Sequence, residues 1–127
     1  MTLDTPPAAE AALQSLSDEM EIAAEGLAAA RNEEVEAQHA YEAAKRRAQL
    51  SPDAPPVGVH GGIRVTVADK AAWVDDQVAR EKFEWDIAKA TRQAASTRLT
   101  MLRDQLSAAQ SIASSVRTTY QGTGRWQ

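Results

Sequence analysis

Residues 51–65 have the sequence SPDAPPVGVHGGIRV, which holds three of the five prolines and three of the six glycines of the chain. By contrast, residues 8–48 contain one glycine and no proline, and residues 67–117 contain neither. Because proline and glycine interrupt helices, this pattern predicts two long helices joined by a connector. The expected boundaries are 5–50 for the first helix, 51–65 for the connector, 66–117 for the second helix and 118–127 for a flexible tail.

The composition indicates a single small domain that is built from long helices. Alanine provides 26 of the 55 hydrophobic residues among 127, and 25% of the residues are charged, which is typical of long helices rather than of a compact core. The chain has no cysteine and only two histidines, so we expect no metal site and no cofactor. No apolar run approaches the roughly 18 residues of a membrane span, and the N-terminus lacks the layout of a signal peptide. We therefore expect no membrane association and a cytoplasmic location.

Apolar residues recur at the heptad positions through which two helices pack against each other. Ten of eleven such seam positions in the first helix are apolar, the exception being Glu34. They are Leu13, Leu16, Met20, Ala23, Leu27, Ala30, Glu34, Ala37, Tyr41, Ala44 and Ala48. Twelve of fourteen in the second helix are apolar, the exceptions being Glu81 and Arg92. They are Ala71, Val74, Val78, Glu81, Trp85, Ala88, Arg92, Ala95, Leu99, Leu102, Leu106, Ala109, Ala113 and Val116. The periodicity predicts an all-α protein in which the two helices form an antiparallel helical hairpin or coiled coil. About fifty residues of helix make a rod of roughly 75 Å, too long for a surface helix of a compact monomer.

The second helix carries further apolar residues outside this seam. If they belong to one broad core face, the hairpin needs no second partner. If they form a separate face, that face needs another helix to cover it. We favour the second interpretation, because several of these side chains are too large for an exposed side, and so predict a homo-oligomeric bundle. The predicted oligomer interface consists of Trp73, Phe83, Ile87, Met101 and Ile112.

The connector has a pattern of its own around the Gly61-Gly62 pair. Apolar residues alternate on both sides of this pair, over residues 57–65. Such alternation around two glycines is typical of a β-hairpin with a two-residue turn. A two-stranded hairpin is only marginally stable without neighbours, so the segment is either a short β-hairpin or a disordered loop.

Charge is distributed unevenly along the chain, although its net value is only −4. Residues 1–44 carry ten acids and one base, whereas residues 45–127 carry 13 bases and eight acids. In an antiparallel hairpin the acidic first helix would lie beside the basic later half of the second helix. Most basic residues would then pair with carboxylates rather than contact a ligand.

One basic cluster falls outside that pairing, at the end of the hairpin that carries the connector. We predict that it binds nucleic acid through phosphates, in a salt-dependent and sequence-independent manner. The alternative is that the bases compensate the negative C-terminal end of the first helix. Aromatic side chains for base stacking are scarce here, since only Tyr41 and Trp73 lie near this end. The predicted nucleic-acid-binding residues are Lys45, Arg46, Arg47, Arg64 and Lys70.

Catalytic motifs are absent from the sequence, so we do not expect an enzyme. It contains no phosphate-binding loop of the GxxxxGK[ST] type and no HExxH zinc motif. The pairs Glu33-Glu34 and Asp75-Asp76 are adjacent, so on a helix their side chains point about 100° apart and do not form a catalytic dyad. Serine and threonine are frequent over residues 96–119, but no histidine lies near them.

The stretch YEAAKRR at residues 41–47, the connector, and VADK at residues 67–70 together resemble the UvsY-type recombination mediators of tailed bacteriophages. The resemblance extends over about residues 15–117. It implies a protein that binds single-stranded DNA, forms ring-like oligomers and helps load a RecA-type recombinase onto strands covered by single-strand-binding protein. It also implies that Lys45, Arg46 and Arg47 contact the DNA, in the host cytoplasm if the protein is phage-encoded.

Two other classes of protein share this architecture. The first is a non-enzymatic coiled-coil protein without nucleic-acid binding, such as a phage scaffold, an assembly chaperone or a host-factor binder. In that case the second apolar face docks another protein, and the basic cluster only compensates a helix end. The second is a secreted helical hairpin of the WXG type, which is disfavoured because the connector has no Trp-x-Gly.

Overall fold

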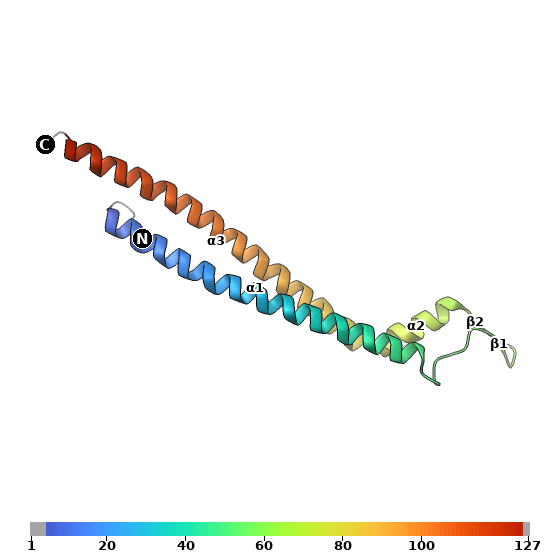
Figure 1. The fold of residues 1–127 in the computed structure, drawn as a ribbon. Helices are drawn as coiled ribbons and strands as arrows, with labels where there is room; N and C mark the ends of the chain where they lie inside the picture. The colour runs from blue at the N-terminus through green and yellow to red at the C-terminus, as the bar shows by residue number, and fades with distance from the viewer. Residues whose placement is uncertain (1–4, 126–127) are drawn as a thin grey trace. The chain divides into compact units, whose positions relative to one another are not determined.

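The computed structural model describes residues 5–125 of the chain, with side chains up to residue 121. Two long helices, α1 and α3, dominate the fold (Figure 1). The all-α class and the helical hairpin are thus confirmed, and the connector contains a short antiparallel β-hairpin rather than a disordered loop. In chain order the elements are α1 (Pro6–Gln49), β1 (Gly58–His60), β2 (Ile63–Val65), α2 (Val67–Gln77) and α3 (Ala79–Arg125).

Both ends of α1 lie where the sequence predicts them. Thr5 caps its start, since its Oγ1 accepts a hydrogen bond from the backbone N–H of Ala8 at 3.3 Å. Pro6 then occupies the first helical position, where a missing N–H has no intrahelical partner to lose. The helix ends at Gln49, just before Ser51-Pro52, because a residue that precedes proline is disfavoured in the helical conformation.

The start of α2 is fixed by a reciprocal pair of hydrogen bonds between Thr66 and Asp69. Thr66 Oγ1 accepts from the Asp69 N–H at 3.1 Å, and Asp69 Oδ2 accepts from the Thr66 N–H at 2.8 Å. This capping box satisfies two backbone donors at the helix start. The hydrogen bond from the Thr66 backbone N–H makes the largest contribution to lowering the pKa of Asp69, and the Thr66 side chain makes the next largest.

The predicted second helix, 66–117, is interrupted at Val78 and therefore consists of two helices. Val78 has φ −109° and ψ 14°, outside the helical region. It is only 2% exposed and packs in a buried cluster with Ala44, Ala48 and Val74. The interruption coincides with this packing contact and not with a proline or glycine, which is why the sequence pattern does not predict it.

At its other end α3 continues to Arg125, beyond the expected end at residue 117. Residues 118–121 include no proline or glycine, and nothing there forces the helix to stop. The hydroxyls of Thr118 and Thr119 donate to the carbonyls of Ser114 and Ser115, each at 3.0 Å. The first eight residues of the predicted tail are thus helical, and its last two lie outside the described residues.

The chain divides into two compact units, and each is described by itself. The terminal unit comprises residues 5–29 and 93–125, in which segments of α1 and α3 pack antiparallel. Near one end of this unit, Glu10 Oε1 and Arg117 Nη2 lie 3.6 Å apart. Its core consists of Ala23, Leu27, Leu99 and Leu102, with Leu16, Met20 and Ala95 packed against them.

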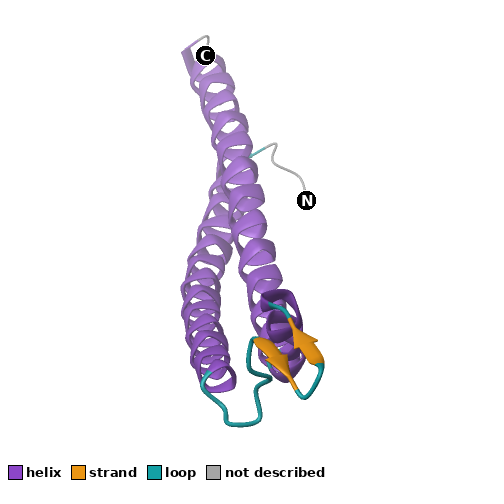
Figure 2. Ribbon diagram, turned by 90° about the vertical axis from the view of Figure 1, so that its right-hand side faces the viewer, coloured by secondary structure: helices purple, strands orange, loops and turns teal. Residues whose placement is uncertain are grey.

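The connector unit comprises Ala30–Arg92 and holds the end of α1, the β-hairpin, α2 and the start of α3 (Figure 2). Its core lies between α1 and α2, where Ala44 and Ala48 pack against Val74 and Val78. Tyr41 and Trp73 are half-buried against this cluster. Small alanines on α1 leave room for the bulkier side chains of its partner helix.

Seam positions predicted from the heptad pattern are confirmed as the packed faces of the helices. Every predicted seam residue of α1 is buried or half-buried, and so is every one of α2 and α3 except Ala71. Two of the polar exceptions pair with each other, since Arg92 Nε lies 2.7 Å from Glu34 Oε2. The side chains of this pair are only 32% and 21% exposed, so a charged contact is embedded in an otherwise apolar seam.

The β-hairpin has the predicted two-residue turn at Gly61-Gly62. In its register Val59 faces Arg64 and His60 faces Ile63. Gly61 and Gly62 have φ values of 59° and 81°, as a tight primed turn requires. Most residues of both strands are exposed, including Val59 at 68% and Ile63 at 69%. The hairpin therefore presents apolar side chains to solvent.

Candidate nucleic-acid interface

All five predicted nucleic-acid-binding residues lie in the connector unit. Lys45, Arg46 and Arg47 lie near the end of α1, Arg64 lies on β2, and Lys70 lies in the first turn and a half of α2. Arg46, Arg47 and Arg64 are exposed, whereas Lys45 and Lys70 are half-buried. Residues 45–70 carry five bases and two acids, a net charge of +3.

The residues that line three surface hollows show which of these cations lie close together. Lys45 and Lys70 line the same hollow of about 590 Å³, together with Leu50 and Val67. Arg64 lines a neighbouring hollow that shares Val67 with the first. Arg47 lines a third one, beside Trp73 and Glu81. The structure thus brings Lys45 and Lys70 together, with Arg64 next to them, but it does not gather all five residues in one recess.

None of the five cations forms an ion pair with a carboxylate among the residues that the structure describes. Lys45 Nζ lies 5.9 Å from the centre of the Tyr41 ring, at the outer limit of a cation–π contact. Arg46 and Arg47 also occupy the last turn of α1, where a positive charge is favourable beside the negative helix end. The positive charges of all five residues are therefore available to bind an external anion.

Five of the thirteen bases whose side chains the structure describes have carboxylate partners, which is fewer than the charge distribution predicts. Two of these pairs join α3 to α1, so acidic residues of the first helix meet basic residues of the second at two positions. Three lie within α3 itself. The pairs are Arg92–Glu34 at 2.7 Å, Arg117–Glu10 at 3.6 Å, Arg80–Glu84 at 3.4 Å, Lys82–Asp86 at 3.1 Å and Lys89–Asp86 at 3.8 Å.

Both aromatic residues near the basic cluster are engaged in packing. Trp73 packs against the core of the connector unit, and the Tyr41 ring stacks on Trp85 with centroids 5.2 Å apart and an interplanar angle of 29°. Lys82 and Lys89 lie over the Trp85 ring at 4.7 and 3.9 Å. These rings are therefore not free platforms for bases, so a nucleic acid would be held here through its phosphates.

Sequence reasoning missed the arrangement around Trp85. The sequence nevertheless contains the pattern that predicts this arrangement. Trp85 occupies a seam position, and Lys82 and Lys89 lie three residues before it and four residues after it, on the same face of the helix. The indole Nε1 of Trp85 is buried and has no hydrogen-bond partner among the described residues. Cation–π contacts and the stack on Tyr41 hold this ring in place instead.

The predicted oligomer interface divides into exposed and packed residues. Phe83 and Ile87, in the connector unit, are 64% and 50% exposed, and Met101 and Ile112, in the terminal unit, are 56% and 44% exposed. Trp73 differs, because it is half-buried against the core cluster of the connector unit. Four of the five residues therefore lie outside the seam with much of their apolar surface uncovered.

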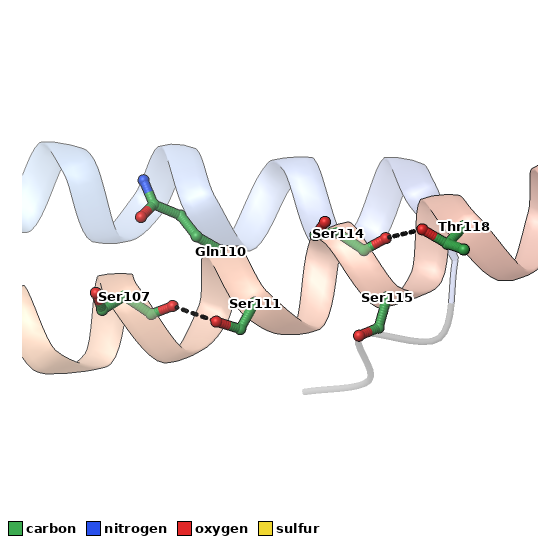
Figure 3. A pocket seen from close by; sticks show the side chains of 6 residues that line it. All are labelled: Ser107, Gln110, Ser111, Ser114, Ser115 and Thr118. Carbon is green, nitrogen blue, oxygen red and sulfur yellow. Dashed lines mark hydrogen bonds between the residues drawn. The ribbon is translucent and has the colours of Figure 1, made fainter.

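A hollow of about 670 Å³ in the terminal unit is lined by hydroxyl side chains and one amide (Figure 3). Two of these hydroxyls bond to their own helix, since Ser111 donates to the Ser107 carbonyl at 3.2 Å and Thr118 to that of Ser114 at 3.0 Å. Among the residues whose side chains the structure describes, no acid, base or imidazole lines the hollow, so none of them could activate a hydroxyl there. The lining residues are Ser107, Gln110, Ser111, Ser114, Ser115 and Thr118.

Exposed aliphatic residues around the basic cluster were not predicted as functional. Leu50 is 84% exposed and Val67 is 73% exposed. The sequence held a signal for both, because each is an apolar residue at the connector end of a helix and outside the heptad seam. Together with the hairpin they make this end of the connector unit apolar as well as basic.

The described residues include no group of three histidine or acidic side chains that could hold a metal ion. Within the same part of the chain, no helix combines the length and apolar character that a bilayer crossing requires. A comparison of the chain with protein-family models, curated proteins and solved structures gives no match. The features of the described residues that bear on function are the charges and exposed apolar side chains of the connector unit.

Proposed function

We propose that this protein is an oligomeric single-stranded DNA-binding accessory protein that acts as a recombination mediator. The observation that carries the proposal is that five cations grouped around the connector have no carboxylate partner among the described residues. Arg31, Arg98 and Arg103 also have none there, but they lie outside this group in the sequence. The charge of the five cations of the basic cluster is therefore available to phosphates.

Phosphate contacts suit this site better than base recognition does. A flexible single strand can follow cations that are spread over the end of α1, β2 and α2. Among the described residues no free aromatic ring lies between these cations to read a base. Affinity should then come from the release of counterions and depend steeply on salt. We expect little preference for sequence.

The oligomeric part of the proposal is supported by the apolar side chains left uncovered on α3. Phe83, Ile87, Met101 and Ile112 are between 44% and 64% exposed. Copies that pack through such residues would place several basic clusters in one assembly. Each cluster alone neutralises only a few phosphates, so several together would bind a strand more tightly.

The role in recombination rests on the resemblance to UvsY-type mediators. In that role the protein would help a RecA-type recombinase to replace single-strand-binding protein on DNA, in the host cytoplasm of a phage-infected cell. It would be checked by following recombinase filament growth on a strand covered with single-strand-binding protein. The protein should shorten the lag before growth.

DNA binding is tested by changing Lys45, Arg46 and Arg47 together to alanine. We expect affinity for a labelled single-stranded oligonucleotide at low salt to fall at least tenfold, with an unchanged far-ultraviolet circular dichroism spectrum. The matched control changes Arg80, Arg98 and Arg103 to alanine, which removes the same charge from exposed positions outside the basic cluster. Equal losses in both variants, or no loss in the first, would contradict the proposal.

The second candidate function is that of a coiled-coil protein-interaction module without DNA binding. The exposed aliphatic residues beside the basic cluster favour it, because Leu50 and Val67 are uncovered at a place where neither contributes to the core. On this account the intact protein would show no salt-dependent affinity for any oligonucleotide. The same titration with unmodified protein therefore distinguishes the two functions.

A further inference from the structure

The hollow that Lys45 and Lys70 share lies between the end of α1 and the start of α2, and we call it the tip groove. Its volume of about 590 Å³ suits a few side chains of a ligand rather than a folded domain. The groove lies wholly within the connector unit. It is lined by Lys45, Gln49, Leu50, Val67, Lys70, Ala71, Val74 and Asp75.

Aliphatic side chains form much of the wall of the tip groove. Val74 is 3% exposed and belongs to the core of the unit, whereas Leu50 and Val67 are 84% and 73% exposed. A ligand that enters the groove can therefore cover two large aliphatic side chains that the chain itself leaves to solvent. Such coverage favours a ligand with apolar groups of its own.

Two cations accompany these aliphatic residues. Lys45 and Lys70 are half-buried. A lysine in such a setting characteristically lays its alkyl stem on apolar surface and keeps its ammonium group in solvent. Within the described part of the chain, Asp75 is the one acid in the lining, and it forms no ion pair with either lysine. The groove thus offers positive charge next to apolar surface, and the complementary ligand carries negative charge next to apolar groups.

We propose that the tip groove binds a short acidic peptide segment of a partner protein, in which carboxylates alternate with aliphatic side chains. The aliphatic side chains cover Leu50 and Val67, and the carboxylates meet Lys45 and Lys70. A nucleic acid satisfies only half of this chemistry, because none of the described residues that line the groove has an aromatic ring on which a base could stack. A recess of this size can also hold individual side chains, which a peptide provides and a flat surface does not.

This site goes beyond DNA binding and does not depend on it. Arg46 and Arg47 do not line the tip groove, whereas Leu50 and Val67 carry no charge. The two activities can therefore be removed separately. They overlap at Lys45 and Lys70, so an acidic peptide and a DNA strand compete for these lysines.

The test measures binding of the full-length protein to a fluorescein-labelled peptide of three glutamates alternating with three leucines, by fluorescence anisotropy at low salt. We expect saturable binding with one peptide per chain. One control peptide has serines in place of the leucines, and another has lysines in place of the glutamates. Each should bind at least tenfold more weakly, because each lacks one half of the complementary chemistry.

Two protein variants locate the site. Leu50→Ser should weaken peptide binding about tenfold and leave oligonucleotide binding and the circular dichroism spectrum unchanged. The matched control is Val59→Ser, which alters an exposed aliphatic residue of β1 outside the groove and should change neither ligand's affinity. The double change Arg46→Ala and Arg47→Ala should weaken oligonucleotide binding while peptide binding is retained.

Several outcomes would overturn the inference. The first is that the protein does not bind the peptide. The second is that the serine-substituted peptide binds as tightly as the leucine peptide. The third is that Leu50→Ser does not change the affinity for the peptide. Leu50-dependent binding of phosphatidylserine vesicles without peptide binding would assign the groove to a lipid surface instead. Leu50-dependent self-association without peptide binding would assign it to a second copy. Peptide binding by a protein that ignores oligonucleotides would contradict only the proposed function.

Discussion

Asp69 is the residue whose charge is most directly tied to a local structure. The hydrogen bond that the Thr66 backbone N–H donates to its carboxylate, and to a lesser degree the Thr66 side chain, lower the pKa of Asp69 below 3.8. The charged form therefore stabilises the start of α2 at neutral pH, and this contribution is lost as the pH falls through the lowered value. We expect Thr66→Ala to raise the pKa of Asp69 part of the way to 3.8, measured by NMR of the carboxyl carbon. A midpoint at or above 3.8 in the unmodified protein would contradict the capping box.

The Glu34–Arg92 pair gives a second prediction at this scale. Because these side chains are mostly shielded from solvent, Arg92→Ala leaves a carboxylate in the seam and should lower the free energy of unfolding by about 1–2 kcal/mol. The control is Arg117→Ala, whose pair with Glu10 is more than half exposed and should contribute no more than about 0.5 kcal/mol. Urea unfolding followed by circular dichroism measures both. Equal losses would show that the seam pair has no special role.

Within the helices, neighbouring residues of α3 distinguish the seam from the second apolar face. Leu102 is 4% exposed and lies in the core of the terminal unit, whereas Met101 is 56% exposed. Leu102→Ala should destabilise the protein by about 2–4 kcal/mol, because it opens a cavity in a seam that otherwise contains many alanines. At a protein concentration low enough to dissociate the proposed oligomer, Met101→Ala should cost less than about 1 kcal/mol. Similar losses in thermal unfolding would mean that the seam is assigned wrongly.

How far each element follows from the sequence depends on whether its cause is local. The ends of α1, the capping box of α2 and the Gly61-Gly62 turn arise from residues within a few positions of each other, and all were predictable. The interruption at Val78 has no local signal, because it accompanies packing against alanines some thirty residues earlier in the chain. Likewise, the Tyr41–Trp85 stack could not be derived until the register of the helices was known.

The candidate site was predictable only in part for the same reason. The basic residues were visible as a break in the charge pattern, but which of them share one recess depends on how the connector folds. Leu50 and Val67 illustrate the limit, because only the structure shows that these aliphatic side chains flank the groove of Lys45 and Lys70.

For the whole molecule, assembly is the property that the uncovered residues of α3 predict. We expect light scattering to show an oligomer, and changing both Met101 and Ile112 to alanine to lower its mass without loss of helix. Ile22→Ala is the control, because Ile22 is 69% exposed on α1, outside the proposed interface. A monomeric mass for the unmodified protein at micromolar concentration would contradict this prediction.

The central claim, that the unpaired cations at the end of α1 hold single-stranded DNA through phosphates, is tested most directly by the salt dependence of binding. The logarithm of the binding constant for a labelled oligonucleotide is plotted against the logarithm of the salt concentration. If Lys45, Arg46 and Arg47 each contact a phosphate, changing all three to alanine should reduce the slope by about 2. The triple change at Arg80, Arg98 and Arg103 should leave the slope unchanged. An identical slope in all three proteins, or no measurable binding by the unmodified protein, would contradict the account.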